Sequence, residues 1–170
     1  PKLERPLRDE RDIRSLERYP SLEGVGFVAD AIKLMKKELG DRTALIGFAG
    51  SPFTLASYLI EGGGSKEYEH LKTMLYSRPE LLQELLDLLG DQILDSLRMQ
   101  VDAGVDAVQL FDTWGGILHP ADYEKHVLPV VRRILDGLKD TGVPRIYFLK
   151  GSAPYNHLVS TLDCECFGVD

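Results

Sequence analysis

Short, continuous apolar runs alternate with longer amphipathic segments along most of this chain. TALIGFAG (43–50) is a short continuous apolar run, which predicts a strand buried on both faces. VDAVQLFD (105–112) predicts a second buried strand and PRIYFLK (144–150) a third strand. CFGVD (166–170) predicts a fourth strand. Between these runs, apolar residues spaced three and four positions apart predict helices.

The segment FVADAIKLMKKELGDR (27–42) has the helical period and ends at Gly40, a typical helix stop. Its apolar face is expected to contain Phe27, Ile32, Leu34, Met35 and Leu39. Further helices are predicted over 66–78, 79–104, 119–142 and 156–162, after a polar lead-in over 1–22. Pro129 is expected to bend the helix over 119–142, because proline cannot donate a backbone hydrogen bond.

Strands that alternate with helices indicate an α/β fold with a parallel sheet. No linker or repeat interrupts the chain, so one domain is predicted over residues 1–170. A closed eight-stranded barrel typically takes about 250 residues, so four strands predict a partial (β/α)8 TIM barrel whose N- and C-terminal strands are missing. We expect such a fragment to fold poorly or to oligomerise, because it exposes strand edges and apolar faces.

The charge and the cysteines narrow the class of protein. A net charge of −7 without any basic stripe argues against nucleic acid as a partner. No apolar run approaches the ~18 to 20 residues of a membrane span, and the first residues lack a signal-peptide core. Cys164 and Cys166 lie too close together for a mutual disulfide, which fits a reducing compartment. A cytoplasmic location is therefore expected.

Metal and nucleotide sites have weak support. Cys164, Cys166 and His157 could form half of a zinc site, but no second pair follows, and free cysteine is commonly a small buried apolar residue. GVGFVA (24–29) resembles a dinucleotide fingerprint, yet no strand is predicted before it, which favours a helix entry. We expect no metal and no bound cofactor.

The glycine run in GGGSKEY (62–68) does not match the phosphate-loop motif, in which glycine directly precedes the lysine. Glycine triplets occur where a backbone must bend sharply or approach another group closely. We therefore expect a mobile turn beside a site at the carboxyl end of a strand.

Candidate ligand contacts follow the predicted strands. Asp112 and Thr113 end a buried strand, the position from which parallel barrels take ligand-contacting side chains. Asp112 could instead cap the next turn through local hydrogen bonds. Lys150 ends the third predicted strand and is a candidate anion contact, whereas Asp170 is a weaker polar candidate.

Three motifs together resemble the uroporphyrinogen decarboxylase family, in the family's order and spacing through nearly the whole chain. They are GFAGSPFTLASYLIEGGG (47–64), QLFDTWGGIL (109–118) and YFLKG (147–151). The resemblance implies a barrel enzyme, usually a homodimer, that removes CO2 from the four acetate arms of uroporphyrinogen III and forms coproporphyrinogen III. It also implies that the small-molecule partner is a tetrapyrrole and that neither a metal nor an organic cofactor is needed.

The resemblance implies substrate contacts by Tyr58, which precedes the Glu-Gly-Gly-Gly run, and by Thr113. The family's arginine-bearing segment, its essential aspartate loop and its C-terminal histidine have no counterpart in residues 1–170, so the chain itself is expected to be inactive. Two alternatives stay open. One is a corrinoid or coenzyme M methyltransferase of the same barrel superfamily, although its zinc-binding His-x-Cys is absent, and the other is a non-catalytic porphyrin-binding module.

Overall fold

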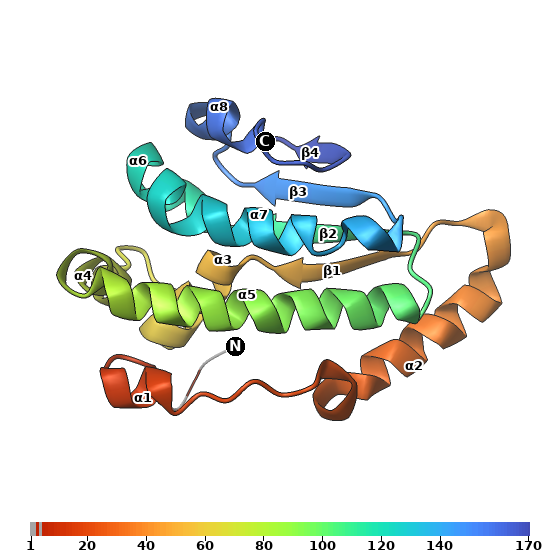
Figure 1. Cartoon of the computed structure of the whole chain (residues 1–170), viewed down its shortest axis with the longest axis horizontal. Helices are drawn as coiled ribbons and strands as arrows, with labels where there is room; N and C mark the ends of the chain where they lie inside the picture. The colour runs from red at the N-terminus through yellow and green to blue at the C-terminus, as the bar shows by residue number, and fades with distance from the viewer. Residues whose placement is uncertain (1–2, 4) are drawn as a thin grey trace.

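A four-stranded parallel sheet forms the centre of the molecule in the computed structural model, which describes residues 3 and 5–170 (Figure 1). The strands follow one another in the order β1-β2-β3-β4 and comprise Ile46–Gly50, Ala107–Asp112, Arg145–Leu149 and Cys166–Gly168. All four predicted strands are therefore present, and their alternation with helices confirms the α/β fold. Residues 1, 2 and 4 of the expected lead-in lie outside the described residues.

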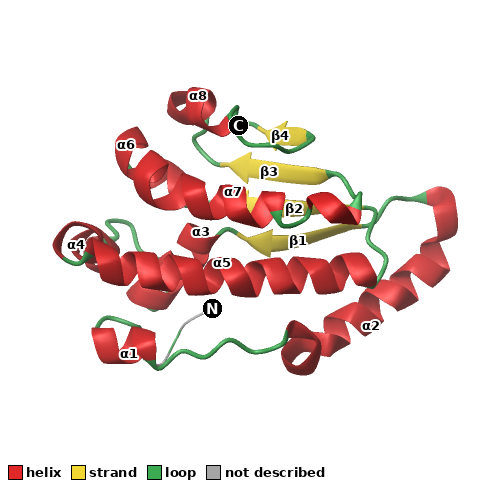
Figure 2. Ribbon diagram, viewed as in Figure 1, coloured by secondary structure: helices red, strands yellow, loops and turns green. Residues whose placement is uncertain are grey.

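Two of the described α-helices precede the first strand, and the others connect each strand to the next. Two of the connecting helices, α5 (Pro79–Asp102) and α7 (Leu128–Asp136), lie over the sheet and run roughly along the strand direction (Figure 2). Their bounds are α1 Glu10–Arg14, α2 Ser21–Leu39, α3 Pro52–Glu61, α4 Glu69–Ser77, α5 Pro79–Asp102, α6 Pro120–Asp122, α7 Leu128–Asp136 and α8 Asn156–Val159. Helix α5 begins at a proline, whose missing N–H costs nothing in the first turn of a helix. The predicted helices over 66–78 and 79–104 are thus confirmed.

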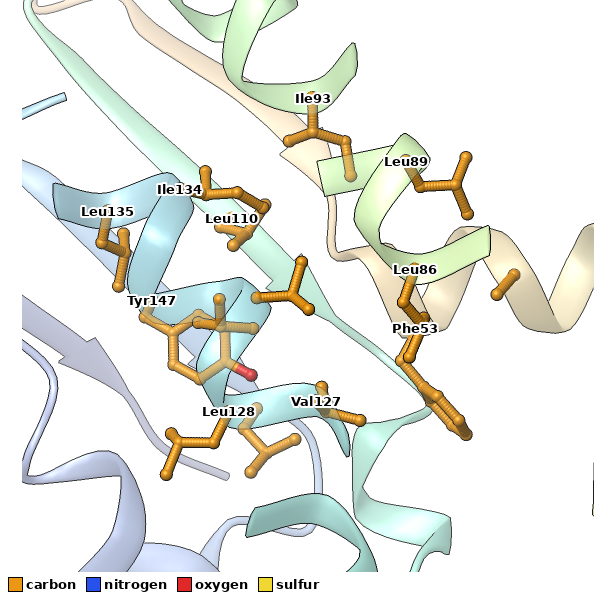
Figure 3. Close-up of a cluster of buried hydrophobic side chains, with 14 of the residues drawn as sticks. Phe53, Leu86, Leu89, Ile93, Leu110, Val127, Leu128, Ile134, Leu135 and Tyr147 are labelled. Carbon is orange, nitrogen blue, oxygen red and sulfur yellow. The ribbon is translucent and has the colours of Figure 1, made fainter. Parts of the chain in front are cut away.

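The core lies between the sheet and the helices that cover one of its faces. Alternate residues of β2 and β3 are buried there, including Leu110 and Tyr147. Figure 3 shows that leucine and isoleucine side chains of α5 and α7 surround these two residues. A side chain buried in such a core contributes about 1.5–3 kcal/mol through the apolar surface it removes from water.

The opposite face of the sheet is open, so the expectation that the run 43–50 is buried on both faces is wrong. Phe48 of β1 is 63% exposed and Ile46 is 47% exposed. Phe48, Phe111 and Phe148 form a row across three strands, with ring centroids 5.9 Å apart in each neighbouring pair. No described helix packs on this row, and continuous apolarity alone could not show which face would remain open.

The apolar face predicted for α2 is also largely exposed. Ile32 is buried, but Phe27 and Leu34 are 71% and 62% exposed, because α2 contacts α5 along only one side. The helix begins at Ser21 and includes GVGFVA, with non-helical dihedral angles at Val25. The helix entry is thus confirmed at this motif, and no described strand precedes it.

The predicted helix over 119–142 is divided into several pieces. A π-helical turn over Tyr123–Val127 separates α6 from α7, and a 3-10 turn over Lys139–Thr141 follows. Pro129 explains the π turn, because its ring would crowd the carbonyl four residues earlier in a regular helix. The bend expected at this proline therefore takes the form of a wider turn just before it.

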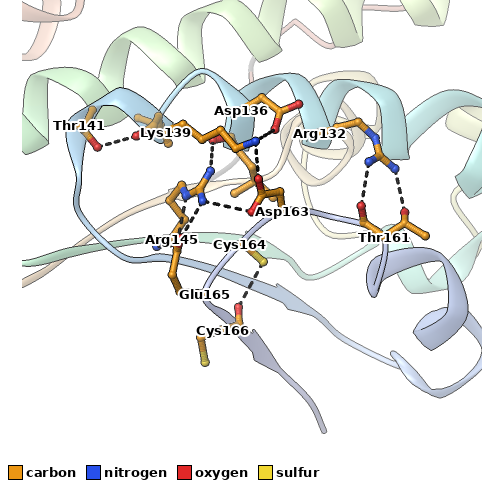
Figure 4. A network of polar contacts seen from close by, with 12 residues as sticks. Arg132, Asp136, Lys139, Thr141, Arg145, Thr161, Asp163, Cys164, Glu165 and Cys166 are labelled. Atoms are coloured by element: carbon orange, nitrogen blue, oxygen red, sulfur yellow. Dashed lines mark hydrogen bonds and ion pairs between the residues drawn. The ribbon is translucent and has the colours of Figure 1, made fainter.

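A polar network joins the amino ends of β3 and β4 to the end of α7 (Figure 4). The buried Arg145 guanidinium donates to Glu165 from Nη2 at 2.7 Å and from Nε at 3.1 Å, and Nη1 donates to the Leu135 carbonyl at 2.9 Å. The hydrogen bonds that Glu165 accepts from Arg145 lower the pKa of Glu165 to about 2.

Within the described residues, no helix is both long enough and apolar enough to cross a membrane.

Candidate functional site

The carboxyl ends of the strands meet on the α4 side of the molecule, toward which the arrowheads of β1 and β3 point (Figure 1). Asp112 of β2 is in register with Leu149 of β3, and the Lys150 N–H donates to the Asp112 carbonyl at 3.1 Å. Thr113 and Lys150 are therefore neighbours at the ends of adjacent strands. Asp112 and Leu149 are both buried in the core. Because side chains alternate along a strand, the residues that follow them, Thr113 and Lys150, are directed away from the core.

An aromatic group beside these strand ends brings together residues from four segments. The Trp114 ring lies 6.4 Å from the Tyr58 ring of α3 and 5.4 Å from the Tyr68 ring. Lys150 places its Nζ 5.5 Å from the Trp114 centroid, within the range of a cation–π contact. The structure thus groups two of the residues expected at the site, Tyr58 and Lys150, around a single indole next to the third, Thr113.

Tyr68 belongs to this aromatic group, but no sequence pattern indicated it. Its backbone is left-handed, with φ of 53°, and it is the only non-glycine residue of the described chain with positive φ. Its side chain is 5% exposed, and burial, followed by the influence of Tyr58 and Glu61, raises the pKa of its phenol. Such backbone strain is often found at functional positions, yet spacing and composition cannot reveal it.

The first glycine of the triplet ends α3 and receives the N-terminal segment. Gly62 has φ of +80°, and a Cβ at this position would lie 2.6 Å from Pro6 Cγ. The Leu3 N–H donates to the Gly62 carbonyl, and the Leu7 N–H donates to the Leu59 carbonyl, both at 2.9 Å. The close approach of the N-terminal segment therefore explains why a glycine stands at position 62. The mobility expected of the whole turn stays a prediction.

Asp112 is fully buried beneath the site instead of facing a ligand. One carboxylate oxygen accepts hydrogen bonds from Thr54 Oγ1 and the Gly115 N–H, both at 2.9 Å. The other accepts from Ser51 Oγ at 3.0 Å and from the Tyr147 hydroxyl at 2.9 Å. The bond from Gly115 confirms the local capping that the sequence left open. Burial raises the pKa of Asp112, and the four hydrogen bonds oppose that rise.

This buried network supports the backbone on which the candidate contacts stand. Thr54 Oγ1 also accepts a hydrogen bond from the backbone N–H of Trp114 at 3.1 Å. The hydroxyls of Tyr147 and Tyr123 lie 2.6 Å apart, which extends the network to the π turn. Asp112 consequently connects the start of α3, the end of β2 and the middle of β3, and these are the elements that position Tyr58, Thr113 and Lys150.

The weaker candidate, Asp170, stabilises a turn. Its carboxylate accepts hydrogen bonds from the Gly151 N–H at 2.9 Å and 2.8 Å and from the Ser152 N–H at 3.3 Å. These amides lower the pKa of Asp170. The carboxylate thus fixes the turn that follows Lys150.

The cysteines lie at the other end of the sheet, before and within β4. Cys164 is partly buried, Cys166 is exposed, and both thiols are free. The Cys164 thiol lies 3.6 Å from the Cys166 carbonyl oxygen. Among the residues that the structure describes, no cluster of three histidine, cysteine or acidic side chains could hold a metal ion.

Comparisons with known proteins agree with the motifs. The whole chain, residues 1–170, matches the sequence profile of the family "Uroporphyrinogen decarboxylase (URO-D)". It is 43% identical over 171 residues to the uroporphyrinogen decarboxylase of Citrifermentans bemidjiense and 44% identical over 174 residues to that of Neisseria meningitidis serogroup B. These alignments cover 100% of this chain but 50% and 49% of the relatives. The chain therefore spans about half the length of the curated relatives it matches.

A solved structure supports the fold. A methyltransferase from Methanosarcina mazei superposes with a TM-score of 0.71 at 15% sequence identity. The superposition covers 85% of this chain and 42% of the methyltransferase chain. Together with the four parallel strands, this likeness supports an α/β fold that forms part of a barrel.

Proposed function

This chain belongs to the uroporphyrinogen decarboxylase family, and from that premise we propose that it supplies part of the substrate cleft of an enzyme that converts uroporphyrinogen III to coproporphyrinogen III. The observation that carries the proposal is the grouping of Tyr58 and Lys150 around Trp114, beside Thr113, at the carboxyl ends of the strands. Ligands of parallel barrels bind at this end. A homodimeric enzyme and a cytoplasmic location belong to the same proposal and rest on the family resemblance.

The reaction removes CO2 from each acetate arm of the substrate, and the electron pair left behind needs an acceptor. Protonation of the adjacent pyrrole makes the ring itself that acceptor, as the family resemblance implies, so the proposed mechanism requires neither a metal nor an organic cofactor. The hydroxyls of Tyr58 and Thr113 would donate hydrogen bonds to substrate carboxylates. Hydrogen bonds to charged groups contribute about 1.5–3 kcal/mol each.

The chain alone is proposed to bind the tetrapyrrole without turning it over. The resemblance implies that catalysis also needs an arginine-bearing segment, an aspartate loop and a histidine, and we propose that residues 1–170 do not supply them. A chain of net charge −7 also needs a local positive region to accept a substrate with eight carboxylates. We expect those further groups to be necessary for catalysis.

A hybrid enzyme tests this proposal. The half of the Neisseria meningitidis enzyme that matches this chain would be replaced by residues 1–170. The hybrid is incubated with uroporphyrinogen III without oxygen, and its products are separated by their number of carboxylates. We expect coproporphyrinogen III from the hybrid and none from the chain alone.

Substitutions at the proposed contacts make this assay specific. Tyr58→Phe and Thr113→Val should each lower kcat/KM by about 10-fold or more, because each removes one hydrogen bond to a charged group. Tyr19→Phe is the matched control, since Tyr19 is 60% exposed and lies before α2. A folded hybrid that binds the tetrapyrrole but releases no CO2 would favour the non-catalytic module, and unchanged kinetics in both variants would contradict the assigned contacts.

A further inference from the structure

We propose that Lys150 binds one carboxylate of the tetrapyrrole and that Trp114 holds the ammonium group in place for this contact. The inference rests on the proposed function and adds a cationic subsite to it. The observations that support it are the strand register, the surroundings of Lys150 and the packing of Trp114.

The register places Lys150 beside a residue that is already a proposed substrate contact. The Lys150 N–H donates to the carbonyl of Asp112, which puts Lys150 opposite Thr113 on the neighbouring strand. Adjacent strands lie about 4.8 Å apart. One carboxylate can therefore accept a hydrogen bond from the threonine hydroxyl while it pairs with the lysine ammonium.

The ammonium group has no competing anion in the described part of the chain. No described carboxylate lies within 4.0 Å of Lys150 Nζ, although twelve other basic-to-acidic pairs among the described residues do meet that distance. The charge of Lys150 contributes to the lowered pKa of Asp170. The Asp170 carboxylate, however, already accepts hydrogen bonds from the backbone N–H groups of Gly151 and Ser152. The positive charge of Lys150 is thus left for a ligand.

Trp114 restricts where that charge can lie. Its ring faces the Lys150 ammonium at 5.5 Å, and this contact reduces the freedom of a long, exposed side chain. The indole Nε1 is buried and has no hydrogen-bond acceptor among the described residues. The ring is held by its contacts with Tyr58 and Tyr68 instead of by a hydrogen bond. The Tyr58 side chain and the Lys150 ammonium group are thus positioned around one indole.

A purely structural role for Lys150 makes a different prediction. If its methylene groups only cover Trp114, methionine should replace it without loss, because methionine keeps an unbranched apolar side chain. Arginine, in contrast, keeps the charge and should preserve binding of a carboxylate. Comparing Lys150→Met with Lys150→Arg therefore separates charge from packing.

The test uses the fact that Trp114 is the single tryptophan of the chain. The 170-residue chain is titrated with uroporphyrin, the stable oxidised octacarboxylate, and quenching of Trp114 fluorescence gives the Kd. Lys150→Met should weaken binding by about 3- to 10-fold, in line with a charged contact at an exposed position. Lys150→Arg should stay within about 2-fold, and so should the control Lys33→Met on α2, at the opposite end of the molecule (Figure 1).

The outcomes distinguish this inference from the proposed function. If the unsubstituted chain binds uroporphyrin and Lys150→Met binds equally well, the Lys150 subsite is wrong while the cleft stands. If the unsubstituted chain has a folded circular dichroism spectrum but shows no saturable quenching, the proposed substrate cleft itself fails. In the hybrid enzyme, Lys150→Met should raise KM by a similar factor with kcat nearly unchanged, whereas an unchanged KM would overturn the inference independently.

Discussion

At the scale of single residues, Asp112 determines how the candidate site is supported. Its carboxylate is inaccessible to solvent and accepts four hydrogen bonds from groups at the start of α3, in the turn after β2 and on β3. A buried carboxylate without such donors would strongly destabilise the fold, so the four hydrogen bonds are needed to keep this carboxylate buried. The position of Thr113 consequently depends on the residue just before it.

Replacing Asp112 by asparagine should destabilise the fold. The amide nitrogen would face hydrogen-bond donors, and at least one of them would lose its acceptor in a buried place. We expect a loss of about 2–4 kcal/mol in the free energy of unfolding, measured by urea denaturation. The control Asp30→Asn changes an exposed aspartate of α2 and should stay within about 0.5 kcal/mol. Equal effects of the two substitutions would contradict the role given to Asp112.

The ion pair of Glu165 with Arg145 should make stability depend on pH. The pKa of Glu165 is lowered from 4.5 to about 2 in the folded chain, so its contribution is complete above about pH 4.5 and disappears as the pH falls toward 2. Glu165→Gln should therefore lower the urea midpoint clearly at pH 7 and little at pH 2.5. A difference between the two proteins that is constant over this range would contradict the assignment.

Sequence reasoning proposed some residues of the candidate site and missed others for physical reasons. Thr113 and Lys150 could be proposed because each stands at the end of a predicted strand, whereas Tyr58 was proposed only because the family resemblance implies it. Tyr68 could not be found, since its left-handed backbone and its contact with Trp114 depend on how the 62–68 turn folds back. The burial of Asp112 could not be predicted either, because three of its four donors come from distant parts of the chain.

At the scale of elements, the glycine triplet provides a matched comparison. Gly62→Ala would introduce a Cβ 2.6 Å from Pro6 at a left-handed position, whereas a Cβ at Gly64 meets nothing within 4 Å. We expect Gly62→Ala to lower the free energy of unfolding by about 1–2 kcal/mol or more and Gly64→Ala to be neutral or slightly stabilising. Thermal midpoints would show the difference, and equal midpoints would contradict the close approach of the N-terminal segment.

The order and type of the elements could be predicted, but their interruptions and open faces could not. Apolar runs and helical periods placed all four strands, and Pro129 marked the place where a helix changes. The π turn over Tyr123–Val127 depends on how the chain adjusts around that proline. The open side of α2 was missed because periodicity identifies an apolar face without identifying what covers it.

At the scale of the whole molecule, the open sheet face predicts self-association. Phe48 is 63% exposed within the aromatic row, and β1 forms an edge of the sheet. Exposed apolar surface at an unpaired edge favours association, so the mass measured by light scattering should rise with concentration. Phe48→Ser should reduce this rise more than Tyr76→Ser, which removes a similarly exposed ring from α4. A monomer that melts sharply at all concentrations would contradict this prediction.

The central claim is that a tetrapyrrole binds where the strands end, against Tyr58 and Thr113. A crystal structure of the hybrid enzyme with bound coproporphyrin measures this most directly. We expect the macrocycle beside the carboxyl ends of β1, β2 and β3, with its carboxylate oxygens about 2.5–3.2 Å from the two hydroxyls. A macrocycle bound elsewhere, with both hydroxyls free of it, would contradict the account.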